Sequence, residues 1–551
     1  MEPGAAEISP THKQESKSRS DESNGTEEEA EKIVPPKKGN ERPRGGVKRQ
    51  APDDPSVSPT TTRTRRRQTL TSDAAETEEA KDREIRRLQQ ELADQKNQMQ
   101  NLAALANKGR DLLAQSLVEI AKTEREKERI RLFHEASRVG KYRPSLAFGQ
   151  SDGWEGGMEA EAIDELRKKL RRERDNVESE RRSVQRQMKK AIEMEDAENA
   201  ANDDPDDFME MREVCNHRAE YIRREEAALK DRENRLMADR TLYQKQMLLA
   251  NTEDRSRFKH YPTLKDRFQL LNAIGKGGFS EIYKAFDLEQ MCMCAIKINE
   301  IEAKISDSQA RNLVRWALRE CEIQKGLQHP RIVQLRECFA IDSNAFIMVL
   351  ELCEGETLDM RLKMHGPMPE KEAKSIIVQI LNGLRYLNTS GRKIIHYDIK
   401  PSNVFFNAGQ VKIGDFGLSK MADQSPEGII DLSTRGAGTS WYLPPECHES
   451  ASPTINSKVD VWSTGVVFFE LLFNRRPFGE GQSQDAFRRQ TAVEGTFDLV
   501  FPATPKVSAE AIKFLRRLLT RDRESRPDVL EAIRDPYIRK SCTDPSARGR
   551  K

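Results

Sequence analysis

Apolar residues recur at seven-residue intervals between about residues 80 and 138. They fall at Ile85, Leu92, Met99, Ala106, Leu113 and Ile120. Leu88 and Leu102 lie at two intervening core positions, while polar residues or glycine stand at Gln95, Gly109, Ser116 and Thr123. A heptad repeat of this kind winds helices around a partner. We therefore predict a coiled coil over 80–138 that joins copies of the chain into a homo-oligomer. A single solvated helix, stabilised by charge pairs four residues apart, is the alternative.

The seven-residue pattern stops at a segment with several glycines, 139–160, which we expect to be a linker. Apolar residues return at helical spacing over 161–250, with an interruption at Asn202-Asp203-Asp204-Pro205. Much of this region is Arg and Glu, so its helices need a partner, or each other, to bury a narrow apolar stripe. We therefore predict a second helical, coiled-coil region over 161–250.

The first segment, 1–79, has almost no aromatic residues and is rich in Ser, Thr, Glu, Lys, Pro and Gly. Burial cannot offset the entropy cost of ordering such a segment, so we predict a disordered tail. Two basic clusters lie within it, at 37–49 and 63–67. They are typical of a nuclear import signal or a nucleic-acid contact, and a solvated basic tail explains them equally well.

From about residue 265 the pattern changes to alternating apolar residues with aromatics and glycines, as a folded core requires. This region ends near 538 and is followed by a short polar tail, 539–551. The full chain has 551 residues, of which 33% are charged and 36% hydrophobic, so it exceeds one domain and much of it cannot form a core. The 265–538 region has the length of a two-lobed enzyme.

No run of 18 apolar residues occurs, so no membrane span is expected. The eight cysteines are scattered and lack the paired spacing of a zinc site. We expect them to be reduced thiols. The net charge of +2 says little, because large basic and acidic populations cancel.

A glycine-rich turn lies between two predicted strands at the start of the folded region. Glycines let backbone amides approach phosphate oxygens, although glycine turns are also common in ordinary hairpins. The residues predicted to bind ATP here are Ile274, Gly275, Lys276, Gly277, Gly278, Phe279, Ser280, Glu281 and Ile282. Lys297 lies on the third predicted strand, where we expect its ammonium to point at the nucleotide phosphates. We expect its partner to be Glu320 on the following helix, with Glu322 as the alternative.

A buried strand then leads to Glu351 and Cys353, whose backbone groups are predicted to bind adenine. The chemistry depends on the next two motifs, His396-Tyr397-Asp398-Ile399-Lys400-Pro401-Ser402-Asn403 and Asp415-Phe416-Gly417. This order is that of a protein kinase. Asp398 orients the acceptor hydroxyl, and Lys400 steadies the charge of the transferred phosphoryl group. Asn403 and Asp415 are predicted to bind Mg²⁺.

Lys400, two residues after Asp398, is the serine/threonine-kinase form of this loop. Tyr397 stands where most kinases carry the Arg that binds a phosphate on the activation segment, 415–446. We therefore expect that segment to depend less on a single phosphate. Its candidate phosphosites are Ser433, Thr434, Thr439 and Ser440, although Thr439 can instead contact Asp398 and Lys400. We also expect Glu446 to pair with Arg526, and Asp460 to brace the catalytic loop.

The folded region closely resembles the Tousled-like kinases. The residues that carry the resemblance are 275–281, 396–401, 436–439 and 441–447, with the catalytic-loop tyrosine as the most specific feature. The resemblance implies an α+β, two-lobed protein-kinase fold and a nuclear serine/threonine kinase that uses ATP and Mg²⁺ and oligomerises through coiled coils. It implies roles in DNA replication, chromatin assembly and chromosome segregation, with histone H3 and the anti-silencing histone chaperone as substrates. A scaffold with a vestigial kinase domain is the competing hypothesis.

Overall fold

The computed structural model describes the side chains or backbone of most of the chain. The described residues are 63–143, 153–195, 205–277, 280–301, 307–342, 344–421, 430–431, 438–449, 454–494 and 497–539. Contacts divide the chain into two units, 1–95 and 96–551. Residues 1–62 of the predicted disordered tail, including the basic cluster at 37–49, lie outside the described residues.

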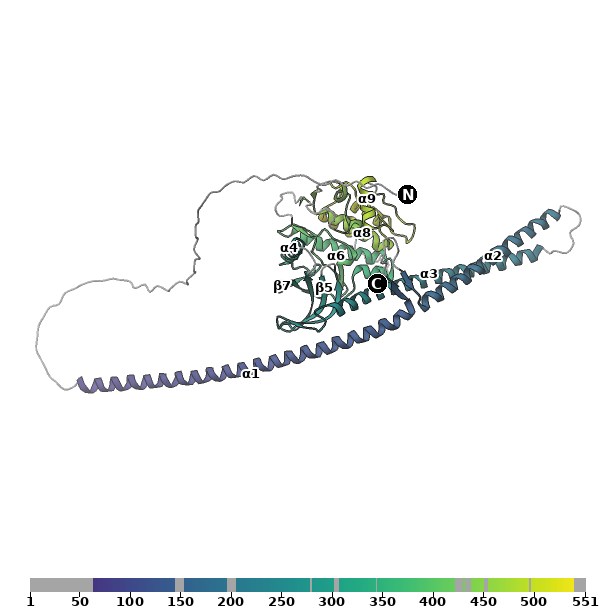
Figure 1. Cartoon of the computed structure of the whole chain (residues 1–551). Helices are drawn as coiled ribbons and strands as arrows, with labels where there is room; N and C mark the ends of the chain where they lie inside the picture. Colours follow the sequence, from purple (N-terminus) through teal and green to yellow (C-terminus); the bar gives the residue numbers. More distant parts are fainter. Residues whose placement is uncertain are drawn as a thin grey trace, which may run out of the picture. The chain divides into compact units, whose positions relative to one another are not determined.

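Three long helices precede the folded domain (Figure 1). They are α1 (Arg63–Val139), α2 (Met158–Glu195) and α3 (Pro205–Arg255). Helix α1 begins inside the range 1–79 that we predicted to be a tail, because Arg, Gln, Ala and Glu continue without proline from residue 63. The predicted linker contains a short hairpin of β1 (Lys141–Arg143) and β2 (Gly153–Glu155). Pro205, at the predicted interruption, is the first residue of α3, where a proline is tolerated.

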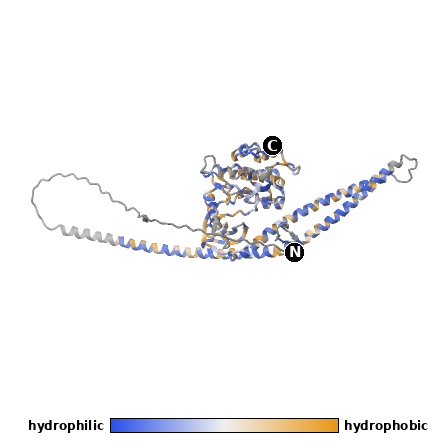
Figure 2. Ribbon diagram, turned by 45° about the horizontal axis from the view of Figure 1, so that its top comes forward, coloured by the Kyte–Doolittle hydropathy of each residue, from blue (hydrophilic) through white to orange (hydrophobic). Residues whose placement is uncertain are grey.

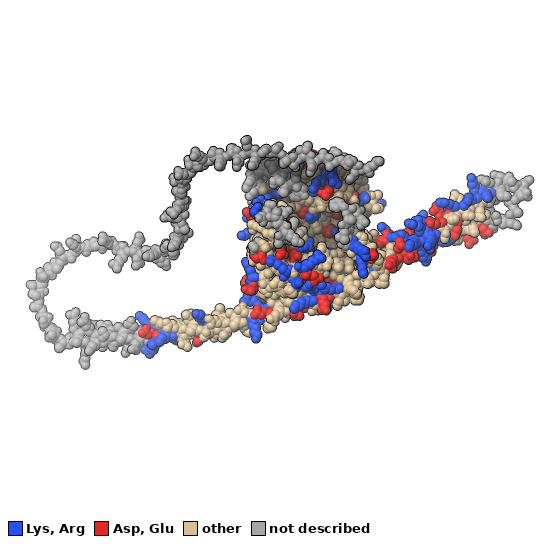
Figure 3. All heavy atoms as spheres, in the orientation of Figure 1, with Lys and Arg blue, Asp and Glu red and all other residues tan. Residues whose placement is uncertain are grey.

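Helices α2 and α3 lie side by side (Figures 1 and 2), and apolar residues of both helices are buried. Buried residues at seven-residue spacing come from both helices: Ile163, Leu170, Val177, Ile222, Leu229 and Leu236. Their outer faces carry interspersed acidic and basic side chains (Figure 3), with cross-helix pairs such as Arg167–Glu233 at 2.7 Å. The predicted need of these helices for one another is therefore met within one chain.

The apolar seam of α1 is exposed instead. Ile85 is 50% exposed, and Leu92 and Met99 are each 68% exposed. Leu88, Leu102 and Ile120 are exposed as well. Pairing of this seam with a second chain stays a prediction.

The small lobe is a six-stranded sheet with the order β3-β4-β5-β6-β8-β7, in which neighbouring strands are antiparallel. Its strands are β3 (Thr263–Leu264), β4 (Phe268–Lys276), β5 (Ser280–Asp287), β6 (Cys292–Glu300), β7 (Leu335–Asp342) and β8 (Ala345–Glu351). Helix α4 (Asp307–Gln324) contacts β7 and β8. Alternating burial along β5 matches the two-residue period of a strand with one face in the core.

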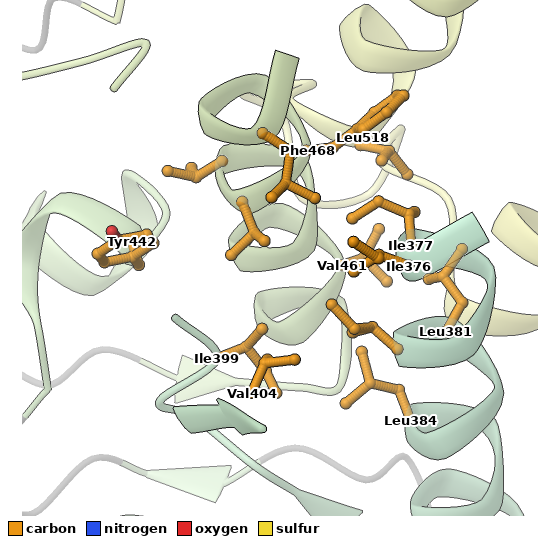
Figure 4. Packing of buried hydrophobic residues seen from close by; sticks show 14 of the residues in the cluster. Ile376, Ile377, Leu381, Leu384, Ile399, Val404, Tyr442, Val461, Phe468 and Leu518 are labelled. Atoms are coloured by element: carbon orange, nitrogen blue, oxygen red, sulfur yellow. The ribbon is translucent and has the colours of Figure 1, made fainter. Parts of the chain in front are cut away.

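The large lobe is mainly helical. Its helices are α5 (Leu358–His365), α6 (Glu370–Thr389), α7 (Glu446–Glu449), α8 (Lys458–Phe473), α9 (Gln484–Glu494), α10 (Ala509–Leu518), α11 (Val529–Arg534) and α12 (Pro536–Arg539). Helix α8 is buried nearly all round, so it forms the centre of this lobe. Figure 4 shows Ile377 and Leu381 of α6 near Val461 and Phe468 of α8, and all four belong to one buried cluster.

Short antiparallel pairs and single turns complete the large lobe. The strand pairs are β10 (Val404–Asn407) with β11 (Gln410–Ile413), β12 (Lys420–Met421) with β9 (Ile394–Ile395), and β13 (Ile430–Asp431) with β14 (Thr454–Ile455). Two 3₁₀ turns, η1 (Pro401–Asn403) and η2 (Ser440–Tyr442), lie in the catalytic loop and the end of the activation segment. Among the described helices, none combines the length and apolar character needed to cross a bilayer.

The cysteine prediction is wrong for one pair. Cys321 of α4 and Cys338 of β7 form a disulfide, with the sulfur atoms 2.12 Å apart. Both residues belong to an apolar cluster between α4 and the sheet, with Leu335 and Met348. Packing brings them together, and their spacing along the chain carries no sign of it.

Candidate active site

The glycine-rich turn joins β4 to β5. The N–H of Gly277 donates to the carbonyl of Ser280 at 2.7 Å, which closes the turn, and Lys276 pairs with Glu281 at 3.2 Å. A Cβ atom at Gly277 would lie 2.7 Å from Ser280 Oγ, so this position accepts glycine alone without a shift. Gly278 and Phe279 lie outside the described residues. At Gly277 the turn therefore has no room for a side chain, which suits the close approach of a phosphate to the backbone.

Ile274 and Ile282 lie on the two strands that flank this turn. Ile274 is 37% exposed. Gly275 is opposite Ile282 in the β4–β5 ladder, and a Cβ at Gly275 would come within 3.2 Å of the Ile282 side chain. The predicted nucleotide-binding residues of these strands are therefore gathered at one end of the sheet.

Lys297 on β6 pairs with Glu320 on α4, as predicted. Its Nζ lies 2.6 Å from Glu320 Oε1 and 3.2 Å from Asp415 Oδ1. Burial alone would lower the pKa of Lys297, but the two carboxylates outweigh it and raise the pKa above its usual value. Glu322, the alternative partner, is exposed. The pair fixes α4 against the sheet and leaves a charged ammonium beside the turn.

The two carboxylates respond differently to this arrangement. Burial raises the pKa of Glu320, with nearby Asp415 adding to the effect and Lys297 opposing it. Lys297 lowers the pKa of Asp415 against the effect of burial. Asp415 therefore stays anionic, as a metal ligand must, and its φ of 61° turns the carboxylate at the end of β11.

Glu351 and Cys353 lie where β8 leaves the sheet. The N–H of Glu351 donates to the carbonyl of Gln334 at 2.9 Å, and its side chain pairs with Lys412 at 2.9 Å. Of the Glu351 backbone, the carbonyl is thus the group suited to adenine. Cys353 follows, half-buried, and burial raises the pKa of its thiol to about 11, so the thiol stays protonated at neutral pH.

Asp398 is held by three neighbours. Lys400 Nζ lies 2.7 Å from Asp398 Oδ2, and Asn403 Nδ2 donates to the same oxygen at 2.9 Å. Thr439 Oγ1 donates to Asp398 Oδ1 at 3.1 Å and accepts from Lys400 Nζ at 2.9 Å. The contact of Thr439 with Asp398 and Lys400 is the alternative we gave to its being a phosphosite. It ties the activation segment to the carboxylate that would orient a substrate hydroxyl.

The donor set suits Mg²⁺. The amide nitrogen of Asn403 is used by Asp398, through the backbone carbonyl and the carboxylate, both at 2.9 Å. This leaves the amide oxygen of Asn403 as a ligand, together with the anionic carboxylate of Asp415. Oxygen ligands of this kind, completed by phosphate and water, are those that Mg²⁺ prefers.

Asp460 of α8 holds the start of the catalytic loop. The N–H groups of His396 and Tyr397 both donate to the carboxylate of Asp460 at 2.8 Å. Asp460 is fully buried, and burial raises its pKa to about 7 while the two N–H groups oppose the rise. Ile399 and Val404, at either side of the loop, belong to the same buried cluster as α6 and α8 (Figure 4). Asp460 therefore fixes the start of the loop, and packing of Ile399 and Val404 fixes its middle and its end.

Tyr397 occupies the position at which most kinases carry a phosphate-binding arginine. It is 2% exposed and has a φ of 66°, and Cys447 packs against the cluster to which it belongs. Its cluster contains Ile395, Leu443, Ile455 and Val459. No ionic group of Tyr397 is thus available for a phosphate.

The activation segment has other attachments. Strand β13 pairs with β14, with Ile430 opposite Ile455. Ser440 is 1% exposed, and its Oγ accepts from Arg488 at 3.0 Å, so it is shielded from modification in this conformation. Ser433 and Thr434 lie outside the described residues. The contact with Arg488 on α9 was missed from the sequence, because no motif links these two positions.

Glu446 and Arg526 form the predicted ion pair. Arg526 Nη1 lies 2.7 Å from Glu446 Oε1, and Nη2 lies 3.0 Å from Oε2. The arginine side chain is fully buried and also donates to the carbonyl of Thr520. This two-bond geometry anchors the end of the activation segment to the large lobe.

Comparison with known proteins agrees with this geometry. Residues 268–538 match the protein kinase domain family, which confirms the two-lobed fold. Over 466 residues the chain is 40% identical to serine/threonine-protein kinase TOUSLED of Arabidopsis thaliana, covering 82% of this chain and 66% of the plant protein. The chain belongs to the tousled family of serine/threonine-protein kinases.

Animal members of the tousled family match a shorter stretch. The chain is 44% identical over 340 residues to tousled-like 1 of Homo sapiens, covering 60% of this chain and 44% of the human protein. It is 43% identical over 356 residues to tousled-like 2 of Mus musculus, covering 62% of this chain and 50% of the mouse protein. The chain thus spans 66% of the plant protein and about half of the animal ones.

Proposed function

We propose that the chain transfers the γ-phosphate of ATP to serine and threonine hydroxyls of protein substrates. The observation that carries this proposal is the position of Asp398, held by Lys400, Asn403 and Thr439. Its carboxylate orients the acceptor hydroxyl and takes its proton, while Lys400 steadies the charge on the transferred group. Mg²⁺ bound by Asn403 and Asp415 would neutralise the phosphate charge.

We further propose that the substrates are nuclear proteins and that the kinase acts in chromatin assembly, DNA replication and chromosome segregation. Histone H3 and the anti-silencing histone chaperone are the proposed substrates. Membership of the tousled family supports this role. The basic clusters of the N-terminal segment support nuclear localisation, and a weak nucleic-acid contact there is the alternative use of the same charges.

Assembly through α1 is part of the proposal. The exposed seam at Ile85, Leu92 and Met99 supports pairing with a second chain, because large apolar side chains at heptad spacing favour association. Pairing would raise the local concentration of one catalytic domain near another and favour phosphorylation in trans.

Phosphorylation of histones and of a histone chaperone by wild type and Asp398→Asn tests the activity. We expect incorporation at Ser and Thr by wild type, and its loss in Asp398→Asn. Equal incorporation by both proteins would overturn the proposal. If Asp398→Asn fully rescues the function of the chain in cells, the scaffold hypothesis, with a vestigial kinase domain, replaces it. The intact pair of Lys297 and Glu320 argues against that outcome.

A further inference from the structure

The helices that precede the kinase domain contact strand β4 of its small lobe. Leu271 of β4 packs in a small buried cluster with Tyr261 and with Ala121 of α1. The hydroxyl of Tyr261 donates to Asn272 Oδ1 at 3.1 Å, and the Asn272 amide donates to Glu124 Oε2 of α1 at 3.2 Å. Packing and hydrogen bonds therefore both hold α1 against β4, the strand that runs into the glycine-rich turn.

Glu253, near the end of α3, is bonded directly to that strand. Its side chain is buried, and Oε1 accepts the backbone N–H of Ala273 at 2.7 Å. The β4–β5 register shifts on both sides of Ala273, so the ladder is irregular there. Ala273 comes two residues before Gly275. A carboxylate outside the sheet thus fixes the strand at the place where its own pairing is weakest.

The other oxygen of Glu253 faces α1. Arg125 Nε lies 3.3 Å from Glu253 Oε2, and the same guanidinium donates to Asp254 Oδ1 at 2.8 Å and to the carbonyl of Lys259 at 3.3 Å. One arginine of α1 therefore joins α3, the segment after it and the carboxylate that holds β4. Burial raises the pKa of Glu253, while the bonds from Ala273 and Arg125 act against this.

We propose that Glu253 is a positioning residue for the ATP-binding turn, and that Arg125 of α1 keeps it in place, so nucleotide affinity depends on α1 being docked on the small lobe. The inference rests on the proposed kinase function and adds a regulatory link to it. The turn binds phosphate through backbone amides, whose positions follow the end of β4. Without the bond at Ala273 the irregular strand has more conformations to lose when ATP binds.

The test uses the full chain and compares the KM for ATP with kcat and with the KM for protein substrate. Glu253→Leu removes the bond to the Ala273 N–H and the ion pair with Arg125. We expect its KM for ATP to rise about fivefold to tenfold, because β4 loses a buried hydrogen bond to a charged group. We expect kcat and the protein-substrate KM to change by less than about twofold, since the catalytic loop is untouched. Arg125→Met shifts the KM for ATP in the same direction by a smaller factor.

Two variants separate positioning from folding. Glu253→Gln keeps an oxygen for the Ala273 N–H, so it restores most of the ATP affinity. Asp254→Asn weakens the attachment of α3 to Arg125 and Arg129 of α1, and leaves the contacts of Glu253 with Arg125 and with β4 in place. We expect Asp254→Asn to have an ATP KM close to that of wild type and a thermal midpoint close to that of Glu253→Gln.

An unchanged KM for ATP in Glu253→Leu would overturn the inference. So would a uniform loss, in which KM for ATP, KM for protein and kcat worsen together with the thermal midpoint. Calorimetric titration with ATP and Mg²⁺ measures the same difference without phosphoryl transfer. A wild type that binds ATP but transfers no phosphate refutes the proposed function, and the binding comparison then still decides on Glu253.

Discussion

Tyr397 is buried in an apolar cluster, and the neutral side chain of Cys447 packs against that cluster. An arginine at this position needs an anion, which a phosphorylated activation segment supplies. A buried tyrosine with a neutral partner needs none. The pairing of β13 with β14 gives the activation segment a second attachment that also requires no phosphate.

We therefore expect the activation segment to work without phosphate. A Ser433→Ala/Thr434→Ala variant, assayed on a peptide after phosphatase treatment, should keep most of the wild-type kcat. Tyr397→Phe, which keeps the buried ring and removes only the hydroxyl, should cost no more than about 1 kcal/mol of stability and leave the same phosphate independence. A complete loss of peptide phosphorylation in the double alanine variant would refute this expectation.

Thr439 should be needed for turnover rather than for nucleotide binding. It bridges Lys400 and Asp398, so Thr439→Ala lets the carboxylate and the ammonium shift from the acceptor hydroxyl. We expect kcat to fall about tenfold to a hundredfold, because a small misplacement of the reacting groups slows the chemical step by about that factor. Steady-state kinetics should give an unchanged KM for ATP.

Thr439→Ser is the matched control, because it keeps the hydroxyl and removes one methyl group. We expect it to recover most of kcat. If Thr439→Ser is as slow as Thr439→Ala, packing rather than hydrogen bonding explains the role of this residue. If the KM for ATP rises together with the loss of kcat, the defect extends beyond the catalytic loop.

Sequence reasoning was most successful where the chemistry is local. Asp398, Lys400 and Asn403 lie on one short loop, so their spacing alone predicts their meeting. The pair of Lys297 and Glu320 was also expected, because strand and helix lengths in this fold are regular. The geometry places these residues together, while their roles in catalysis stay predictions.

Contacts between distant elements were not predictable in the same way. Glu253 reaches Ala273 because α3 ends against β4, and no periodicity in either segment indicates that meeting. The disulfide of Cys321 and Cys338 likewise depends on how α4 packs against the sheet. The early start of α1 was missed because a basic, polar composition was taken as disorder, although the same residues have high helix propensity.

The ion pair of Glu446 and Arg526 should be worth far more than a surface pair. Glu446→Gln leaves the guanidinium buried without an anion, so we expect a loss of about 3–5 kcal/mol of stability. Lys363→Met provides the comparison, since Lys363 and its partner Asp359 are 51% and 36% exposed. For that variant we expect about 0–1 kcal/mol. Thermal or urea unfolding measures both, and similar losses would contradict the buried character of the first pair.

Glu470 should make stability depend on pH. Its Oε2 accepts the Tyr442 hydroxyl at 2.7 Å, and burial raises its pKa from 4.5 to about 7. Between pH 4.5 and 7 the folded chain holds a proton that the unfolded chain releases, so the free energy of unfolding falls as pH rises through this window. This contribution is constant below the window and above it.

Glu470→Gln keeps an acceptor for Tyr442 and cannot ionise, so it lacks this loss. We expect the variant to gain about 1–3 kcal/mol relative to wild type at pH 8, and little at pH 4.5. Asp460, whose pKa is also about 7, titrates in both proteins and cancels from the difference. Thermal midpoints of the two proteins at both pH values measure the effect, with Glu524→Gln, a 74% exposed side chain, as the control. A difference that is the same at both pH values would show that Glu470 is already ionised in the acidic sample, because only a proton held by the folded state makes the gap grow with pH.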